Sequence, residues 1–197
     1  LKKGSEIITT PRSYYTSASS IINCGMKPKF SDISIDSQNL DPIKLEKSIN
    51  KKTKAIICVH LSGYPCDMNR IIKIAKDNNI YVIEDCSQAH GASILNKKVG
   101  SFGDISAWSF CQDKIISTGG EGGMVATNKL KLYKNVLSIK DNGRNYEKIK
   151  KISYSGSFNY IHDFIGSNYR MTEIQAIIGI SQLKRLDQMI LRRNSNA

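Results

Sequence analysis

Residues 54–61 read Lys-Ala-Ile-Ile-Cys-Val-His-Leu, a run in which nearly every side chain is apolar. Such a run predicts a strand buried on both faces, which is typical of the parallel sheets of α/β proteins. A helical pattern with one apolar stripe follows over 67–78, and the next apolar run covers 80–83. Strand, helix and strand in this order form the unit from which a parallel sheet is built.

The same alternation extends over most of the chain. We expect strands at 6–9, 27–33, 54–61, 80–83, 105–110 and 123–126, and helices at 14–24, 42–50, 67–78 and 130–140. The segment 172–175, Thr-Glu-Ile-Gln, has the form of a capping box and predicts the start of a long helix. Residues 142–163 are polar and are expected to form a surface excursion. The predicted fold class is α/β, with three layers around a mostly parallel sheet.

Composition and charge narrow the classes of function. The chain has 197 residues, of which 40% are apolar and 23% charged, as in an ordinary globular domain. Its net charge is +12, but the lysines are spread along the chain without a dense basic block, which does not favour nucleic-acid binding. The five cysteines include no CxxC pair and no histidine stands at ligand spacing to them, so we predict no metal site. We expect a protein of the reducing cytoplasm without a membrane-spanning segment.

Two side chains with useful chemistry follow predicted strands. Ligands of open α/β sheets gather at the carboxyl ends of the strands, where Asp85 and Lys114 stand. Pyridoxal 5′-phosphate (PLP) needs a lysine for its aldehyde and a carboxylate that keeps its pyridine nitrogen protonated. Alone, the pair is weak evidence, because an Asp in this place often caps a helix and a loop lysine is usually solvated.

The surroundings of the pair add further polar groups. Ser109 precedes Lys114 and could bind a phosphate, while Gln88 and His90 follow Asp85 closely enough to face the same cavity. The run 119–123, Gly-Gly-Glu-Gly-Gly, allows close approach to a ligand or to a partner chain. It can equally be a tight hairpin that leads into the strand 123–126.

Longer motifs occur in order along essentially the whole chain, and together they are specific. They include Glu84 to Ala92 (Glu-Asp-Cys-Ser-Gln-Ala-His-Gly-Ala), Val99 to Asp104, Ser109 to Lys114, Gly120 to Gly123, and Asn168 to Glu173. This set resembles the DegT/DnrJ/EryC1/StrS family of PLP-dependent sugar aminotransferases. The resemblance implies the large domain of the aspartate-aminotransferase fold, which is fold type I among PLP proteins.

The resemblance also implies roles for individual residues. Lys114 would be the Schiff-base lysine and the catalytic proton carrier. The other cofactor-binding residues would be Asp85 at the pyridinium nitrogen, Gln88 near the ring hydroxyl, Ser109 at the phosphate, Tyr14 stacked on the ring, and Asn168 at the phosphate of the neighbouring subunit's cofactor. The last role implies a homodimer with shared active sites. His60 and Glu121 match motif positions, but no role is assigned to them.

By the same resemblance, the substrates are an amino acid, expected to be glutamate, and a keto group on a nucleotide-linked deoxysugar. The segment 162–172 looks most like the perosamine-synthase branch, which aminates C4 of a GDP-linked 4-keto-6-deoxysugar. We expect residues 1–197 to be the central part of the large domain. The family's upstream phosphate-binding segment would lie before Leu1 and its small C-terminal domain after Ala197.

Three other functions are weighed against this one. A dehydratase branch of the same scaffold carries histidine in place of the lysine, and Lys114 argues against it. A truncated or regulatory chain that keeps the fold without catalysis is the main alternative. A nucleic-acid-binding protein ranks third, because only the net charge favours it.

Overall fold

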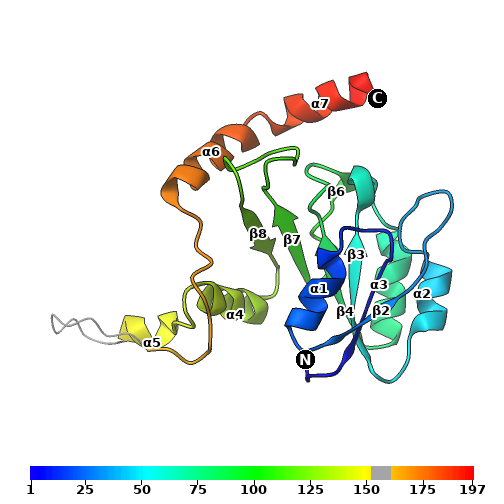
Figure 1. Cartoon of the computed structure of the whole chain (residues 1–197), viewed down its shortest axis with the longest axis horizontal. Coiled ribbons are helices and arrows are strands. Elements are labelled where there is room, and N and C mark those ends of the chain that lie inside the picture. Colours follow the sequence, from blue (N-terminus) through cyan, green and yellow to red (C-terminus); the bar gives the residue numbers. More distant parts are fainter. Residues whose placement is uncertain (152–160) are drawn as a thin grey trace.

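The computed structural model in Figure 1 describes residues 1–151 and 161–197. Six strands form one sheet in the order β2-β1-β3-β4-β7-β8. Their bounds are β1 Glu6–Thr9, β2 Lys27–Phe30, β3 Thr53–Val59, β4 Tyr81–Asp85, β7 Ile105–Ser109 and β8 Gly123–Ala126. All neighbours are parallel except β7 and β8, which pair antiparallel. The predicted α/β class with a mostly parallel sheet is therefore confirmed.

Helices cover both faces of the sheet, which gives the three predicted layers. Helix α1 (Thr16–Asn23) places Ile21 against apolar side chains of β1 and β3. On the other face, α2 (Pro42–Ser48) and α3 (Met68–Asp77) pack Leu45, Met68 and Ile71 against the opposite side chains of the same strands. The strand 54–61 is apolar on both faces because both faces are covered.

The helix starts follow from local sequence. The side chain of Asp41 accepts a hydrogen bond from the backbone of Ile43, and Pro42 occupies the first turn of α2, where a missing N–H costs nothing. Asp67 caps α3 in the same manner by accepting from the backbone of Arg70. These caps fix the direction in which each chain segment leaves the sheet.

Two short elements lie beyond the carboxyl ends of the strands. The 3₁₀ turn η1 (Leu61–Gly63) follows β3, and a hairpin of β5 (Ser93–Ile94) and β6 (Lys97–Lys98) follows β4. The hairpin turn has positive φ at Leu95 (46°) and Asn96 (67°), as a two-residue type I′ turn requires. The sequence does not predict this hairpin, because Leu is uncommon at such a φ.

The C-terminal part differs most from expectation. Helix α4 (Leu130–Lys140) has the predicted bounds, and α5 (Tyr146–Lys151) lies in the segment expected to be a surface excursion; residues 152–160 of that segment lie outside the described residues. The single long helix expected from Thr172 is wrong. The chain instead forms α6 (Glu173–Leu183) and α7 (Leu186–Asn196), with a break where Arg185 takes φ −104° and ψ 2°.

The second strand is shorter than predicted. The ladder between β1 and β2 ends at Phe30, and the backbone of Ser31 makes one further hydrogen bond to Thr9. The chain then turns away, and Ile33 forms an isolated bridge with Leu40. The polar residues after Phe30 therefore belong to a loop.

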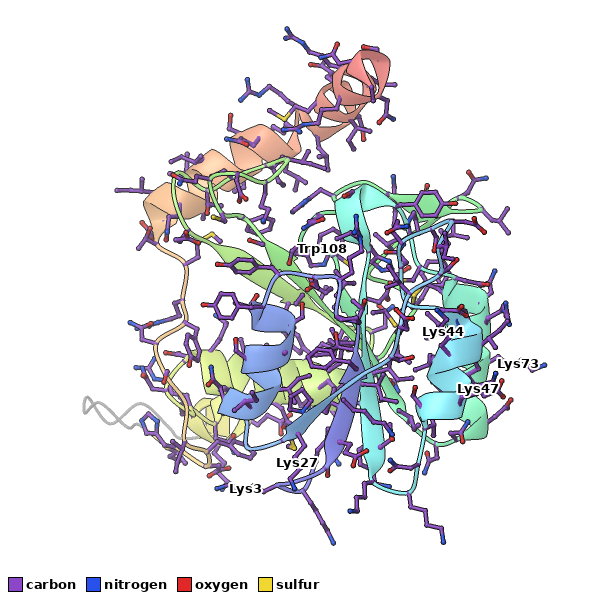
Figure 2. The ribbon with its side chains drawn as sticks, turned by 45° about the vertical axis from the view of Figure 1, so that its right-hand side comes forward. Lys3, Lys27, Lys44, Lys47, Lys73 and Trp108 are labelled. Carbon is purple, nitrogen blue, oxygen red and sulfur yellow. The ribbon has the colours of Figure 1, made fainter. Side chains whose placement is uncertain are left out.

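The basic side chains are distributed over several faces. In Figure 2, Lys44, Lys47 and Lys73 lie on α2 and α3, whereas Lys3 and Lys27 lie at the opposite edge of the sheet from the helix α7. Within the described ranges, no helix combines the length and the hydropathy needed to cross a membrane.

Candidate functional site

The carboxyl ends of β3, β4 and β7 meet at one edge of the sheet, and a cavity of about 730 Å³ opens there. Its wall comes from η1, from the loop after β4, from the loop after β7 and from α7. Two predicted site residues, Gln88 and Lys114, line this cavity, together with His90. The topology thus brings two of the expected cofactor ligands to the place where α/β sheets bind ligands.

Lys114 stands on the loop 110–122, which joins the antiparallel strands β7 and β8. The glycine run 119–123 therefore lies at the end of a long connection between antiparallel strands, and not in the tight hairpin that was one of its two predicted interpretations. The Nζ atom of Lys114 lies 3.2 Å from Oδ1 of Asp113, and its side chain is 20% exposed. This hydrogen-bonded contact lowers the pKa of the Asp113 carboxyl, with a further contribution from Cys111. Asp113 points into solvent, so the amine of Lys114 is held by a weak and replaceable partner.

Asp85 is the last residue of β4. It pairs in register with Ala107, so the side chains of Asp85, Ala107 and Ser109 share one face of the sheet, the face that α1 covers. Its Oδ1 atom accepts hydrogen bonds from the backbone (3.1 Å) and from the hydroxyl (2.6 Å) of Ser87. Its Oδ2 atom has a long contact, 3.5 Å, with the hydroxyl of Ser17 on α1, and no other described residue donates a hydrogen bond to it. One carboxylate oxygen of Asp85 therefore keeps most of its capacity to accept a hydrogen bond.

Gln88 connects two loops at this edge. Its Oε1 atom accepts a hydrogen bond of 2.7 Å from the backbone of Ser62 in η1. Ser62 has φ 54°, and Gly63 next to it has φ 82°, so this turn bends sharply towards the loop after β4. A Cβ atom at Gly63 would lie 3.2 Å from the carbonyl oxygen of Gln88. Among the described residues, no hydrogen-bond acceptor contacts the Nε2 group of Gln88, so this group can donate to a second partner.

Ser109 and Tyr14 lie on the side of Asp85. Ser109 ends β7 and its hydroxyl accepts a hydrogen bond from the backbone of Cys111 at 3.3 Å. Tyr14 precedes α1, is 67% exposed and meets Tyr15 edge to face at 4.8 Å. The α1 face of the sheet edge therefore carries an acid, a hydroxyl and an aromatic ring, and the cavity beside it carries Lys114.

The structure does not bring all the predicted residues together. In the described part of the chain, no hydrogen bond or ion pair joins Lys114 to Asp85. Asn168 lies away from both: it forms a β-bridge with Asp141 at the end of α4, and its side chain accepts a hydrogen bond from Arg170. Asn168 is exposed, as the predicted role towards a second subunit would require.

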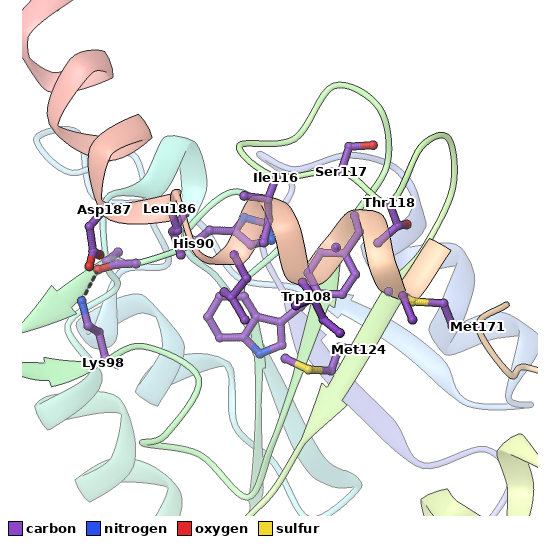
Figure 3. A pocket seen from close by; sticks show the side chains of 18 of the residues that line it. His90, Lys98, Trp108, Ile116, Ser117, Thr118, Met124, Met171, Leu186 and Asp187 are labelled. Carbon is purple, nitrogen blue, oxygen red and sulfur yellow. Dashed lines mark hydrogen bonds between the residues drawn. The ribbon is translucent and has the colours of Figure 1, made fainter. Parts of the chain in front are cut away.

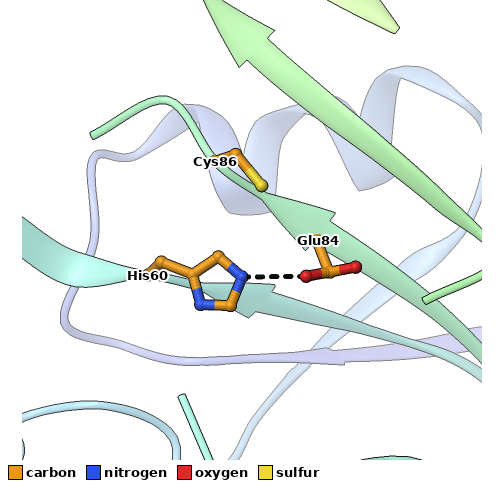
Figure 4. A group of neighbouring side chains, drawn as sticks. All are labelled: His60, Glu84 and Cys86. Atoms are coloured by element: carbon orange, nitrogen blue, oxygen red, sulfur yellow. Dashed lines mark hydrogen bonds and ion pairs between the residues drawn. The ribbon is translucent and has the colours of Figure 1, made fainter. Parts of the chain in front are cut away.

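A second polar cluster lies inside the protein (Figure 4). His60 and Glu84 are fully buried, and the Nε2 atom of His60 lies 3.2 Å from Oε2 of Glu84. Glu84 also accepts backbone hydrogen bonds from Gly100 (2.7 Å), Phe102 (2.8 Å) and Gly103 (2.6 Å). Burial would raise the pKa of the Glu84 carboxyl, but the hydrogen bonds from His60 and these amides outweigh it and lower the pKa.

The Sγ atom of Cys86 completes a triad in which one ligand atom from each residue lies within 4.8 Å of the others. Both ring nitrogens of His60 are already engaged, because Nδ1 accepts from the backbone of Cys66 at 3.1 Å. Burial raises the pKa of the Cys86 thiol. The hydrogen bonds of its histidine and its carboxylate tie this buried cluster to β3, β4 and the loop 100–103.

His90 is a buried polar residue that was expected to face the site cavity, without an assigned role. Its ring lies 5.4 Å from that of Trp108 and 5.8 Å from that of Phe110. Burial lowers the pKa of His90, so its imidazole is neutral. The residue separates the Lys114 cavity from a second, apolar cavity of about 580 Å³ beneath α6, which Trp108, Met124 and Met171 line (Figure 3).

The donor chemistry of this edge fits PLP. A lysine amine, a carboxylate with one under-used oxygen, an amide group and a hydroxyl stand at the ends of neighbouring strands. These are the groups that a protein uses to hold the aldehyde, the ring nitrogen, the ring hydroxyl and the phosphate of this cofactor.

Comparisons with known proteins show what the chain is similar to. The model of the DegT/DnrJ/EryC1/StrS aminotransferase family matches residues 1–197. GDP-perosamine synthase from Escherichia coli O157:H7 is 42% identical over 197 residues, covering 100% of this chain and 51% of that protein.

Two solved structures resemble the chain closely. The aminotransferase from Psychrobacter cryohalolentis has a TM-score of 0.91 and 47% identity, covering 94% of this chain and 47% of its own. GDP-4-keto-6-deoxy-D-mannose-3-dehydratase from E. coli, with bound hydrated PLP, has a TM-score of 0.89 and 32% identity, covering 100% of this chain and 52% of its own. The chain thus spans about half the length of the relatives it matches.

Proposed function

Because this chain belongs to the DegT/DnrJ/EryC1/StrS aminotransferase family, we propose that it forms the PLP-binding part of a nucleotide-sugar aminotransferase. The proposed reaction moves an amino group from an amino acid, glutamate, to C4 of a GDP-linked 4-keto-6-deoxysugar. The observation that carries this proposal is the position of Lys114 in a cavity beyond β4 and β7, beside the strand end that carries Asp85.

PLP, when bound, supplies an electron-withdrawing ring that makes the proton on the carbon next to an amine removable. Lys114 would hold the cofactor covalently through Nζ. Once the amino-acid amine has taken its place, the released Nζ would carry a proton between the substrate carbon and the cofactor, and in the opposite direction after the keto group of the sugar has bound. To react with the cofactor, Lys114 must leave its ion pair with the exposed Asp113. Breaking this pair costs little free energy, because water screens it.

Asp85 would hold the protonated ring nitrogen through its under-used Oδ2 atom, while Ser87 keeps the carboxylate oriented through Oδ1. Gln88 would donate through Nε2 to the ring hydroxyl, since its Oε1 atom is fixed by the backbone of Ser62. Ser109 would bind the phosphate, and Tyr14 would cover the ring. Each of these assignments uses a group that the fold leaves available at the carboxyl edge of the sheet.

The nucleotide and the regiochemistry are proposed from similarity. GDP-perosamine synthase is the name of a relative that matches the entire chain, and the segment 162–172 resembles that branch. Lys114 favours an aminotransferase over the dehydratase, since the dehydratase branch carries histidine at that position. We also propose a homodimer in the cytoplasm, in which the exposed Asn168 reaches the cofactor of the second subunit.

A direct test asks where PLP attaches. The purified protein is incubated with PLP, reduced with borohydride, digested and analysed by mass spectrometry. We expect the modification on Lys114 and its loss in Lys114→Ala, whereas Lys131→Ala, which removes an exposed lysine on α4, should be modified like the original protein. A colourless protein with no modified peptide would favour the non-catalytic alternative.

The substrate assignment needs a second experiment. Amino transfer from glutamate is measured with GDP-, UDP- and dTDP-linked 4-keto-6-deoxysugars, and the position of the new amine is read by NMR. A clear preference for GDP and amination at C4 would support the proposal. A preference for UDP or dTDP, or amination at C3, would refute this finer assignment while leaving the PLP site intact.

A further inference from the structure

The loop 110–122, which carries Lys114, leaves the sheet as a long hairpin connection. Hydrogen bonds join the two ends of the loop near the sheet. The backbone N–H of Phe110 donates to the carbonyl of Gly122 at 2.8 Å, and that of Thr118 donates to the carbonyl of Phe110 at 3.1 Å. Its outer part lies against α6, a helix that follows some fifty residues later in the chain. The contacts between α6 and this loop therefore bear on the position of Lys114.

Among the described residues, two hydrogen bonds cross this boundary, and Gln182 on α6 makes one of them. Its Oε1 atom accepts from the backbone N–H of Ser117 at 2.9 Å. Ser117 lies close to Lys114 in the chain, between the buried residues Ile116 and Thr118. The bond fixes the segment that follows Lys114.

Gln175 makes the other hydrogen bond. Its Nε2 group donates to the carbonyl oxygen of Glu121 at 2.7 Å. Its Oε1 atom accepts from the backbone of Thr172 at 3.0 Å, which completes the capping box at the start of α6. One side chain therefore both starts the helix and holds the far end of the loop.

The two glutamines are two helical turns apart, so they lie on the same face of α6. Gly179 lies between them on that face, and a Cβ atom there would lie 3.0 Å from Cγ2 of Thr118. The helix backbone thus approaches the loop as closely as packing allows, and both glutamines reach backbone groups of the loop directly. This face forms a two-point clamp.

We infer that Gln175 and Gln182 are positioning residues, which hold the hairpin loop so that Lys114 faces the cofactor edge of the sheet. The inference rests on the proposed function of Lys114. Neither glutamine reaches the Lys114 cavity, so both act through the backbone of the loop. Their removal should loosen the loop and change the behaviour of Lys114 without removing any cofactor ligand.

The opposite hydrogen-bonding roles of the two side chains provide a selective test. Gln182 acts as an acceptor, so Gln182→Ala breaks the clamp and Gln182→Glu preserves it. Gln175 acts as a donor towards Glu121, so Gln175→Glu breaks the clamp, while its carboxylate can still serve the capping box. The matched control is Gln188→Ala on α7, an exposed glutamine for which the described part of the chain offers no hydrogen-bond partner.

The first measurement is hydrogen exchange of peptides that cover 110–122, in the cofactor-free protein. Loss of one hydrogen bond should raise exchange in this loop by about fivefold in Gln182→Ala and Gln175→Glu. Gln182→Glu and Gln188→Ala should exchange like the original protein. Unchanged exchange in both clamp-breaking variants would overturn the inference.

The second measurement is the pH dependence of the visible absorbance of the PLP-loaded protein, together with the rate at which Lys114 becomes attached to PLP. We expect a shifted pH midpoint and slower attachment in the two clamp-breaking variants alone. Faster hydrogen exchange, with an unchanged pH midpoint and an unchanged rate of PLP attachment, would show that the glutamines stabilise the loop without positioning Lys114. This result would also overturn the inference. If the original protein takes up no PLP, the proposed function fails, and the exchange data alone decide whether the clamp exists.

Discussion

The Nε2 atom of His60 lies 3.2 Å from the Oε2 atom of Glu84, and both side chains are fully buried. Because Nδ1 of His60 accepts a backbone hydrogen bond from Cys66, the proton of the neutral ring sits on Nε2 and points at Glu84. Glu84 is therefore an anion with four hydrogen-bond donors around it. Three of these donors belong to the loop 100–103, so one buried carboxylate ties β3 and β4 to that loop.

The first prediction concerns the substitution Glu84→Gln. It removes the negative charge and replaces one acceptor oxygen by an NH₂ group that faces donors, so we expect the free energy of unfolding to fall by about 3 kcal/mol. Urea denaturation at neutral pH measures this change. Glu46→Gln, at an exposed position on α2, is the control and should alter stability by less than about 0.5 kcal/mol. Equal stability of the two variants would contradict the structural role of Glu84.

The second prediction concerns acid. The pKa of Glu84 is lower in the folded protein than its ordinary value of 4.5, so the folded state binds this proton less readily than the unfolded state. The stability that Glu84 contributes is thus complete above pH 4.5 and is lost as pH falls through the folded pKa. The stability difference between the original protein and Glu84→Gln should therefore shrink in acid. A difference that grows as the pH falls would show that the folded pKa is raised instead.

These residues show where prediction from sequence stops. The strand 54–61 and the helix caps at Asp41 and Asp67 depend on local patterns, which is why their elements were predicted closely. The role of Glu84 depends on contacts with residues 60 and 100–103, and no local pattern contains them. The break near Arg185 has neither glycine nor proline to mark it, so the pattern predicted one helix.

Part of the candidate site could likewise be predicted from the sequence, and part of it could not. Asp85, Gln88, Ser109 and Lys114 were selected by motif, and the sheet brings them to its carboxyl edge because consecutive parallel strands end there. The family resemblance and the fold class are confirmed, and a matched structure contains PLP. The roles of the individual residues stay predictions. The clamp by Gln175 and Gln182 could not be predicted, since it joins segments far apart in the chain.

The third prediction concerns the partner of Lys114. Asp113→Asn removes the ion pair at Nζ, which is exposed to solvent and therefore weak. We expect Lys114 in the cofactor-free protein to react with acetic anhydride about twofold faster, because the carboxylate of Asp113 no longer holds its amine. The difference should vanish at high salt, which screens the pair. Slower labelling in the variant would mean that Asp113 assists Lys114 rather than restrains it.

The fourth prediction concerns Asp85. Asp85→Asn keeps an oxygen that can accept from Ser87, so the fold should be preserved, but it removes the charge proposed to face the ring nitrogen of PLP. We expect PLP to bind at least about tenfold more weakly, since hydrogen bonds to charged groups are the stronger class. Equilibrium dialysis measures the dissociation constant, and Asp36→Asn, at an exposed position that does not line the Lys114 cavity, is the control. Unaltered affinity would remove Asp85 from the proposed site.

The last prediction concerns the outer face of α6. While Gln175 and Gln182 face the hairpin loop, Ile174 (74% exposed) and Ile177 (68%) project from α6 into solvent. Exposed apolar side chains at this helical spacing are typical of a protein contact surface, and the proposed homodimer supplies a second copy to cover it. Ile177→Glu should therefore weaken self-association at least about tenfold, because it places a charge in an apolar interface.

Sedimentation velocity over a range of protein concentrations measures this effect. Ile35→Glu is the matched control, since Ile35 is an exposed isoleucine (83%) that lies in a loop on the α2 side of the molecule. If both variants and the original protein sediment as the same species at every concentration, α6 does not form the contact between subunits. If Ile177→Glu alone dissociates, its hydrogen exchange over 110–122 reports whether the contact also steadies the loop that carries Lys114.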